Sequence, residues 1–214
     1  MNWQSIQQAI RTCRRCEDEA VVHLRVPCGE KRKPPWEPLR PVRLYFASVA
    51  PPWGGAYFWD ETQRDAVRDG LFAALRDPLG VDVANCHQFL EQRLFLTPAV
   101  KCPSEKDGKD HQPSRSAVKN CGRFLHSELL AAEPERILAL GRRPFEALCD
   151  IFGLEAPRNV ADFRTQTWWV PVGQREVPLS GTFFSGNNRH QGFEFIIQDI
   201  ARILKLAPRN AANA

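Results

Sequence analysis

The sequence predicts an α/β fold in which a central, mostly parallel β-sheet is covered by layers of helices. Short apolar runs typical of buried strands alternate along the chain with segments whose apolar residues recur at helical spacing. Such alternation favours parallel strands joined by helical crossovers. With 214 residues and 43% hydrophobic content, the chain can bury one core, so a single domain is expected over residues 1–207.

Each expected element rests on a local pattern. Trp3, Ile6, Ile10 and Cys13 recur at helical spacing and predict an N-terminal helix. Five prolines within residues 26–41 predict an extended segment without regular structure. Strands are expected at residues 42–49, 94–100, 136–140, 167–172 and 177–184, and later helices at residues 61–75, 114–129, 144–152 and 193–204, with Ser114 as a helix cap. The tail at residues 208–214 lacks large apolar residues and is expected to be disordered.

Charge and hydropathy narrow the class of protein. No apolar stretch is long enough to cross a bilayer, and the polar N-terminus does not look like a signal peptide, so we expect a soluble, cytoplasmic monomer. The net charge of +4 and pI of about 8.8 suit a polyanionic partner such as DNA. An ordinary solvated surface explains this mild excess of charge equally well.

The cysteines indicate a metal or cluster site. Seven cysteines are an odd number, which disfavours a disulfide framework. Cys13 and Cys16 form a CxxC pair, Cys102 ends a predicted strand and Cys121 lies on a predicted helix. Four converging thiolates suit a [4Fe–4S] cluster or a structural Zn²⁺ equally well. Cys28 competes for a place in such a site, since it lies near the CxxC pair in sequence.

Two further cysteines are interpreted differently. Cys86 and Cys149 lie in apolar surroundings, where a free cysteine usually acts as a small buried hydrophobic residue.

A family resemblance covers most of the chain, from Thr12 to about Leu204. The segment Pro98-Ala99-Val100-Lys101-Cys102-Pro103, the later Cys121 and the run Ile137-Leu138-Ala139-Leu140-Gly141-Arg142 resemble the uracil-DNA glycosylase superfamily. The similarity is closest to its iron–sulfur branches, families five and four. It implies a three-layer fold with a central sheet flanked by helices. It also implies a [4Fe–4S] cluster held by Cys13, Cys16, Cys102 and Cys121, which leaves Cys28 out.

The first active-site motif of the family corresponds to Ser48-Val49-Ala50-Pro51-Pro52, so Ala50 and Pro51 are expected to bind the base. Val49 stands where family four has an acidic residue. Family five instead uses an aspartate shortly after an aromatic residue that stacks on the base, which implies Asp60, with Tyr57 or Phe58 as the stacking residue. An aspartate can position water or stabilise positive charge on the sugar of a base swung out of the DNA. The alternative for Asp60 is a helix N-cap.

The second motif corresponds to residues 181–192, where Phe183 occupies the position of a histidine that would donate to the leaving base. Asn188 and His190 are candidate catalytic residues that compensate for it. Phe183, Ser185 and Asn187 are candidate base-binding residues, and Arg189 and Lys101 are candidate contacts to DNA phosphates. The alternative is that this segment is a turn and His190 an exposed loop histidine.

The resemblance implies a monofunctional DNA glycosylase of base excision repair that acts on deaminated bases such as uracil, hypoxanthine or xanthine. Pro98 replaces an asparagine that pairs with uracil in family four, which points to relaxed specificity. Together with Val49 and Phe183, it also suggests an alternative: a catalytically impaired, glycosylase-like protein that binds DNA or senses damage. A third possibility is a zinc-stapled nucleic-acid-binding module.

Overall fold

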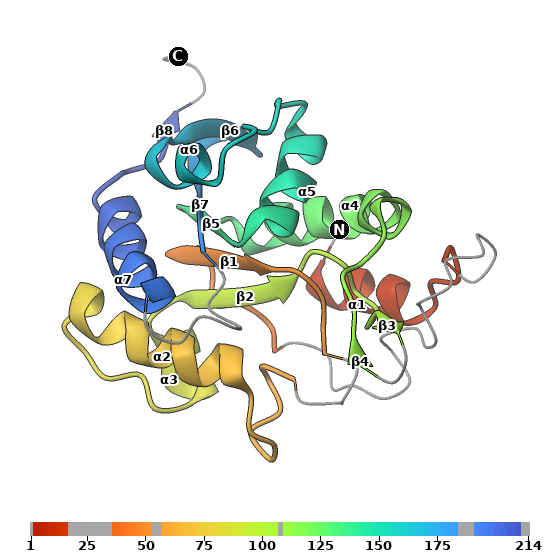
Figure 1. Ribbon diagram of the computed structural model, residues 1–214, viewed down its shortest axis with the longest axis horizontal. Coiled ribbons are helices and arrows are strands. Elements are labelled where there is room, and N and C mark those ends of the chain that lie inside the picture. Colours follow the sequence, from red (N-terminus) through yellow and green to blue (C-terminus); the bar gives the residue numbers. More distant parts are fainter. Residues whose placement is uncertain (1, 17–35, 53–56, 107–108, 184–190, 211–214) are drawn as a thin grey trace.

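The computed structural model describes residues 2–16, 36–52, 57–106, 109–183 and 191–210 (Figure 1). Its helices are α1 Trp3–Arg11, α2 Ala66–Leu79, α3 Cys86–Glu91, α4 Arg115–Ala132, α5 Arg142–Phe152, α6 Val160–Thr165 and α7 Gln191–Leu204. Its strands are β1 Leu44–Ser48, β2 Leu94–Pro98, β3 Glu105–Lys106, β4 Lys109–Asp110, β5 Ile137–Leu140, β6 Trp168–Val172, β7 Arg175–Thr182 and β8 Arg209–Asn210.

The main sheet has the strand order β2-β1-β5-β7-β6, and β8 pairs with β7. The strands β2, β1, β5 and β7 run parallel, whereas β6 and β8 are antiparallel to β7. Every residue of β1, β2 and β5 is buried, as expected for parallel strands covered on both faces. The predicted α/β fold with a mostly parallel sheet is therefore confirmed.

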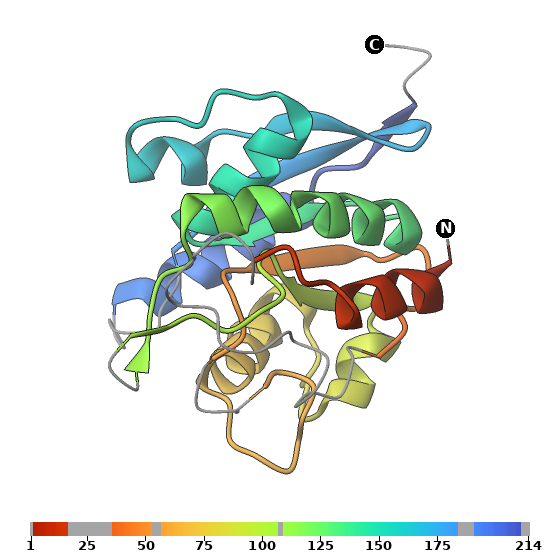
Figure 2. The ribbon, with the colours of Figure 1, turned by 90° about the vertical axis from the view of Figure 1, so that its right-hand side faces the viewer.

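Helices cover the sheet in two groups. Helix α2 packs against α7, whereas α4 packs against both α5 and α1. Figure 1 shows α2, α3 and α7 on one face of the sheet and α1, α4 and α5 on the other, and Figure 2 shows α1 lying alongside α4. The result is the expected three-layer arrangement, with the apolar core on both faces of β1, β2 and β5.

Helix boundaries follow the capping residues. The Ser114 side chain accepts from Ala117 N at 3.1 Å, which confirms it as the cap of α4. Helix α2 begins at Ala66, five residues later than expected, because its N-cap is Asp65, whose Oδ1 accepts from Arg68 N at 2.7 Å. Residues 57–65 therefore form a loop that joins the sheet to α2.

Short elements depart from the sequence expectation. Helices α3 and α6 have six residues each, too few to show a periodic pattern, and β3 and β4 form a small hairpin within the polar loop after Cys102. Residues 209–210 form β8, so the expected disorder of the tail is wrong for these residues. None of the helices in the described segments is long and apolar enough to span a membrane.

Candidate functional site

The described parts of the predicted motifs lie at one edge of the sheet. The carboxyl ends of the four parallel strands lie together because Ser48 is in register with Pro98, and Leu140 with Thr182. The chain crosses from one side of β1 to the other when it continues from β2 to β5. Ligands of open α/β sheets bind at such a switch point, outside the carboxyl ends of the strands. We therefore place the candidate site between the loops that follow β1, β2, β5 and β7.

The loop after β1 is tied to the loop after β2. Ala99 N donates to Ser48 O at 2.7 Å, and Val100 N donates to Val49 O at 3.0 Å. Pro51 is buried and Ala50 is half-buried, and residues 53–56 lie outside the described part of the chain. The first two residues of the first motif, Ser48 and Val49, are thus hydrogen-bonded to the residues that directly follow β2.

The aromatic residues after this loop are buried. Phe58 is 3% exposed, and its ring packs against Trp59, Phe72 and Phe89 at centroid distances of 5.0, 5.8 and 5.2 Å. Trp59 donates from Nε1 to Leu96 O at 3.0 Å. The Phe58 ring therefore belongs to the core. Tyr57, the other residue expected to stack on a base, is also buried, at 5% exposed.

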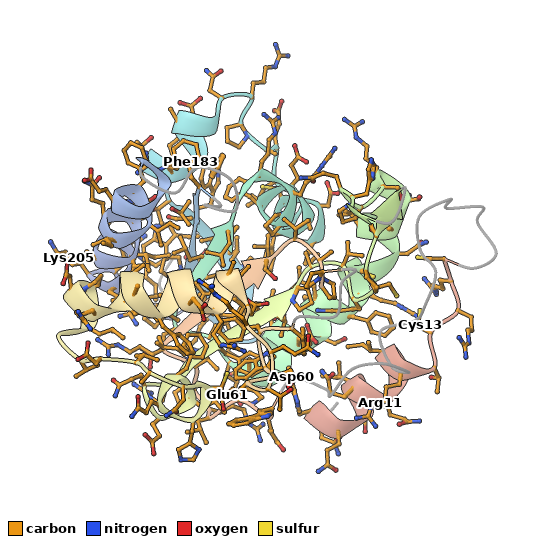
Figure 3. All side chains as sticks on the ribbon, turned by 60° about the horizontal axis from the view of Figure 1, so that its bottom comes forward. Arg11, Cys13, Asp60, Glu61, Phe183 and Lys205 are labelled. Atoms are coloured by element: carbon orange, nitrogen blue, oxygen red, sulfur yellow. The ribbon has the colours of Figure 1, made fainter. Side chains whose placement is uncertain are left out.

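Asp60 follows the aromatic cluster, in the loop before α2 (Figure 3). It is half-buried, and its Oδ1 accepts from Thr62 N at 3.1 Å and from Thr62 Oγ1 at 2.6 Å. The alternative interpretation of Asp60 as a helix N-cap is wrong, because Asp65 caps α2. A fixed carboxylate beside the carboxyl ends of the strands can order a water or stabilise a cation.

Arg68 holds this loop in place, and the sequence alone did not single it out. Its guanidinium donates to the carbonyls of Phe58 at 3.1 Å, Asp60 at 3.0 Å and Gln63 at 2.5 Å. The residue is 7% exposed. A buried guanidinium that satisfies three backbone carbonyls fixes the path of residues 58–63 and hence the position of the Asp60 carboxylate.

The second motif is only partly described. Ser185, Asn187, Asn188, Arg189 and His190 lie outside the described residues. Phe183 is half-buried; Arg164 Cζ lies 4.8 Å from its ring centroid, and the Phe195 ring lies 5.5 Å away. Figure 3 shows Phe183 next to α7, well separated from Asp60. The structure thus brings Asp60 and Phe183 to the same edge of the sheet without direct contact.

Buried charges support the start of the second motif. Arg164 Nε pairs with Asp199 Oδ2 at 2.8 Å, and Arg202 Nη1 donates to Ser180 Oγ at 3.4 Å. Asp199 is 4% exposed. These contacts join α6, α7 and β7, so the backbone that leads into Phe183 is fixed from both sides.

Three of the predicted cysteine ligands, Cys13, Cys16 and Cys121, lie against the first half of α4 or on it. Arg123 Nη2 lies 3.7 Å from Cys13 Sγ, and Asn120 Nδ2 lies 3.7 Å from Cys16 Sγ. Cys121 lies on the same helix, and the backbone N–H of Lys101, next to Cys102 in sequence, donates to Cys121 Sγ at 3.5 Å. Within the described residues, no three His, Cys, Asp or Glu side chains are gathered as the ligands of one metal ion. The four predicted ligands are all thiols, which is the ligand type of an iron–sulfur cluster.

The thiols differ in environment. Burial raises the pKa of Cys121 to about 11, and the nearby thiols of Cys16 and Cys13 add to this rise. Cys86 and Cys149 are fully buried in the core, as predicted, and burial raises the pKa of each to about 12. Cys28 lies outside the described residues.

The expected role of Lys101 as a DNA contact is wrong. It was expected to contact DNA phosphate, but it is 3% exposed, and its Nζ pairs with the buried carboxylate of Glu128 and donates to Pro98 O at 2.5 Å. Gln7 Nε2 donates to the other carboxylate oxygen of Glu128 at 3.2 Å. A buried ammonium that is paired with a carboxylate cannot reach a phosphate. Through Pro98, Glu128 and Gln7, Lys101 instead links β2, α4 and α1.

Comparisons with known proteins show the family of the chain. Residues 41–201 match the family model of the uracil DNA glycosylase superfamily. The type-5 uracil-DNA glycosylase of Pyrobaculum aerophilum is 31% identical over 137 residues, which are 56% of this chain and 53% of that protein. The chain therefore spans about half the length of this curated relative.

Proposed function

Because the chain belongs to the uracil-DNA glycosylase superfamily, we propose that it is a DNA glycosylase of base excision repair. It hydrolyses the N-glycosidic bond of a deaminated base, such as uracil, hypoxanthine or xanthine, that has been flipped out of DNA. The observation that carries the proposal is the position of Asp60 in a fixed loop at the carboxyl edge of the sheet. The likeness to a type-5 uracil-DNA glycosylase supports the same reaction class.

The proposed chemistry assigns the two motif loops different roles. The Asp60 carboxylate orders the attacking water or stabilises the positive charge that develops on the sugar as the bond breaks. Ala50 and Pro51 line the side of the base, and Tyr57 stacks on it, since the Phe58 ring packs against Phe72 and Phe89. Asn188, His190, Ser185 and Asn187 contact the base from the second motif, and Arg189 contacts a phosphate.

We propose that Cys13, Cys16, Cys102 and Cys121 hold a [4Fe–4S] cluster. Three of these thiols lie against the first half of α4 or on it, and Cys102 adjoins the residue that donates to Cys121. Such a cluster supplies a structural link between α1 and the loop after β2, because hydrolysis of the glycosidic bond needs no electron transfer. Iron content and the visible spectrum should both be lost in Cys102→Ala and retained in the core control Cys149→Ala.

A second candidate function is a glycosylase-like protein that binds DNA or senses damage without turnover. The Phe183 ring packs against Arg164 and Phe195, and a phenyl ring offers no donor to a leaving base. Val49 and Pro98 likewise have apolar side chains at positions where family four has an acidic residue and an asparagine. This candidate and the glycosylase share the fold and the DNA partner and differ only in turnover.

The decisive experiment measures abasic product from oligonucleotides that contain uracil, hypoxanthine or xanthine, each single- and double-stranded. Wild type should form product with at least one base, and Asp60→Ala should lower the rate about 10²-fold or more. Asp77→Ala, which removes an exposed aspartate of α2, is the matched control and should match wild type. Absence of product from every wild-type reaction would refute the glycosylase proposal and favour the second candidate.

The monomeric state stays a prediction, which light scattering can check.

A further inference from the structure

A group of exposed basic residues surrounds the end of α1 and the first half of α4. Residues 2–16 and 115–127 contain no aspartate or glutamate, and their basic residues are Arg11, Arg14, Arg15, Arg115, Lys119 and Arg123. All six side chains are exposed. We call these six residues the α1–α4 basic patch. The acidic residues 17–19 follow Cys16 in sequence but lie outside the described segments.

Two residues of the patch differ from several basic residues elsewhere in how their charges are balanced. Some exposed arginines of other elements pair with carboxylates, as in Arg64–Asp69, Arg76–Asp82 and Arg142–Glu146. In the described part of the chain, no carboxylate lies within ion-pair distance of Arg115 or Lys119. Arg115 and Lys119 therefore carry positive charge that no neighbouring carboxylate of the described residues balances, and such charge attracts a polyanion.

The patch is contiguous with the carboxyl edge of the sheet. Arg115, Lys119 and Arg123 follow one another at four-residue intervals, so they form one stripe on α4 with steps of about 6 Å along its axis. Helix α4 leads from the carboxyl end of β2 to the amino end of β5, which places Arg115 at the candidate site's edge and Arg123 farther away. Arg123 lies 3.7 Å from Cys13 Sγ, so the stripe continues onto the end of α1.

We propose that the α1–α4 basic patch binds the phosphate backbone of duplex DNA outside the damaged nucleotide, and so extends the DNA-binding surface from the motif loops across α4 to the end of α1. Long cations at regular spacing suit successive phosphates of a strand and do not read its sequence. The proposal rests on the proposed function, since it takes DNA as the partner. An acidic protein is the competing occupant, and the experiment below distinguishes it.

The test compares two variants with the same change in charge. The patch variant is Arg11→Gln/Arg115→Gln/Lys119→Gln, which leaves Arg123 and the cysteines unchanged. The control variant is Arg40→Gln/Arg76→Gln/Lys205→Gln, whose residues are exposed near the amino ends of the strands; Figure 3 shows Lys205 on the side opposite Arg11. Binding to an undamaged duplex is measured by fluorescence anisotropy between 50 and 200 mM salt, at equal iron content, beside uracil excision by each protein.

The expected result is a shallower salt dependence in the patch variant only. The plot of log K against log[salt] should flatten by about 1 for each removed charge that contacts a phosphate, hence by about 2–3 in total. A difference of less than about 1 from the control variant overturns the proposal and favours an acidic protein as the partner. If wild type excises uracil, the proposed function survives that result. If wild type binds no DNA, both proposals fail. If binding depends on the patch but nothing is excised, the inference stands and the glycosylase proposal fails.

Discussion

Removing the Glu128 carboxylate should strongly destabilise the protein, because Lys101 would keep a buried charge without its partner. The two side chains are 4% and 1% exposed, and among the described residues Pro98 O would be the one acceptor left to the Lys101 ammonium. Breaking a buried pair from one side costs about 3–5 kcal/mol. In a domain of this size, that corresponds to a fall in Tm of roughly 6–20 °C. Glu128→Ala is therefore expected to lower the free energy of unfolding by about 3–5 kcal/mol.

A double-mutant cycle separates the lost charge pair from lost packing. Lys101→Met/Glu128→Leu replaces both partners with apolar groups of similar volume and should be within about 2 kcal/mol of wild type, since no charge is left unpaired. Urea unfolding followed by circular dichroism, under anaerobic conditions at equal iron content, measures Glu128→Ala beside the four proteins of the cycle, which are wild type, Lys101→Met, Glu128→Leu and the double variant. The reasoning is refuted if Glu128→Ala costs less than about 1 kcal/mol, or if the double variant is as unstable as the sum of the two single variants.

Three further predictions follow from the packing. Gly181→Ala should lower the free energy of unfolding by about 1–3 kcal/mol, because a Cβ there would lie 2.0 Å from Phe163 Cδ2. Adding Phe163→Ala should recover less than the full loss of stability. Equal urea midpoints for wild type and Gly181→Ala would contradict this prediction. Arg68→Met should reduce excision about 10-fold or more even in protein that stays folded, because the Asp60 loop loses three hydrogen bonds; unchanged kcat/KM would show that Arg68 does not position Asp60. Cys86 and Cys149 should resist iodoacetamide in native protein at pH 8, because burial raises the pKa of both thiols to about 12. Rapid labelling at pH 8, detected by mass spectrometry, would contradict their burial. The raised pKa of each thiol also stabilises the folded state fully below the unfolded pKa, and this stabilisation is lost as pH rises toward 12.

Much of the fold could be predicted from local patterns. The buried strands β1, β2 and β5 are short apolar runs, and the helices α4, α5 and α7 carry apolar residues at helical spacing, so their periods were visible in the sequence. Helices α3 and α6 were missed because six residues contain fewer than two helical turns. The core positions of Cys86 and Cys149 were also correct, since a thiol in apolar surroundings behaves as a small hydrophobic residue.

Only part of the candidate site, too, could be predicted from the sequence. Asp60 and the four cysteines could be proposed as site residues from the sequence, because a family resemblance is carried by residue identity and order. The roles of individual side chains depended on what lies opposite them. Phe58 and Tyr57 are equivalent aromatics in the sequence and both are buried, and only the tertiary structure shows that the rings of Phe72 and Phe89 lie against Phe58.

By itself, the sequence determined the alternation of strands and helices, the order of the motifs and the set of candidate cysteines, because periodicity and residue type are properties of the chain. Only the tertiary structure decided which charges are exposed. Lys101 is one basic residue among several before the fold is known, and it becomes a buried partner of Glu128 because α4 folds back against β2. Arg115 and Lys119 stay exposed on the outer face of that same helix. Whether a charge meets a carboxylate or solvent depends on distances through space between residues far apart in sequence, which a local pattern does not contain.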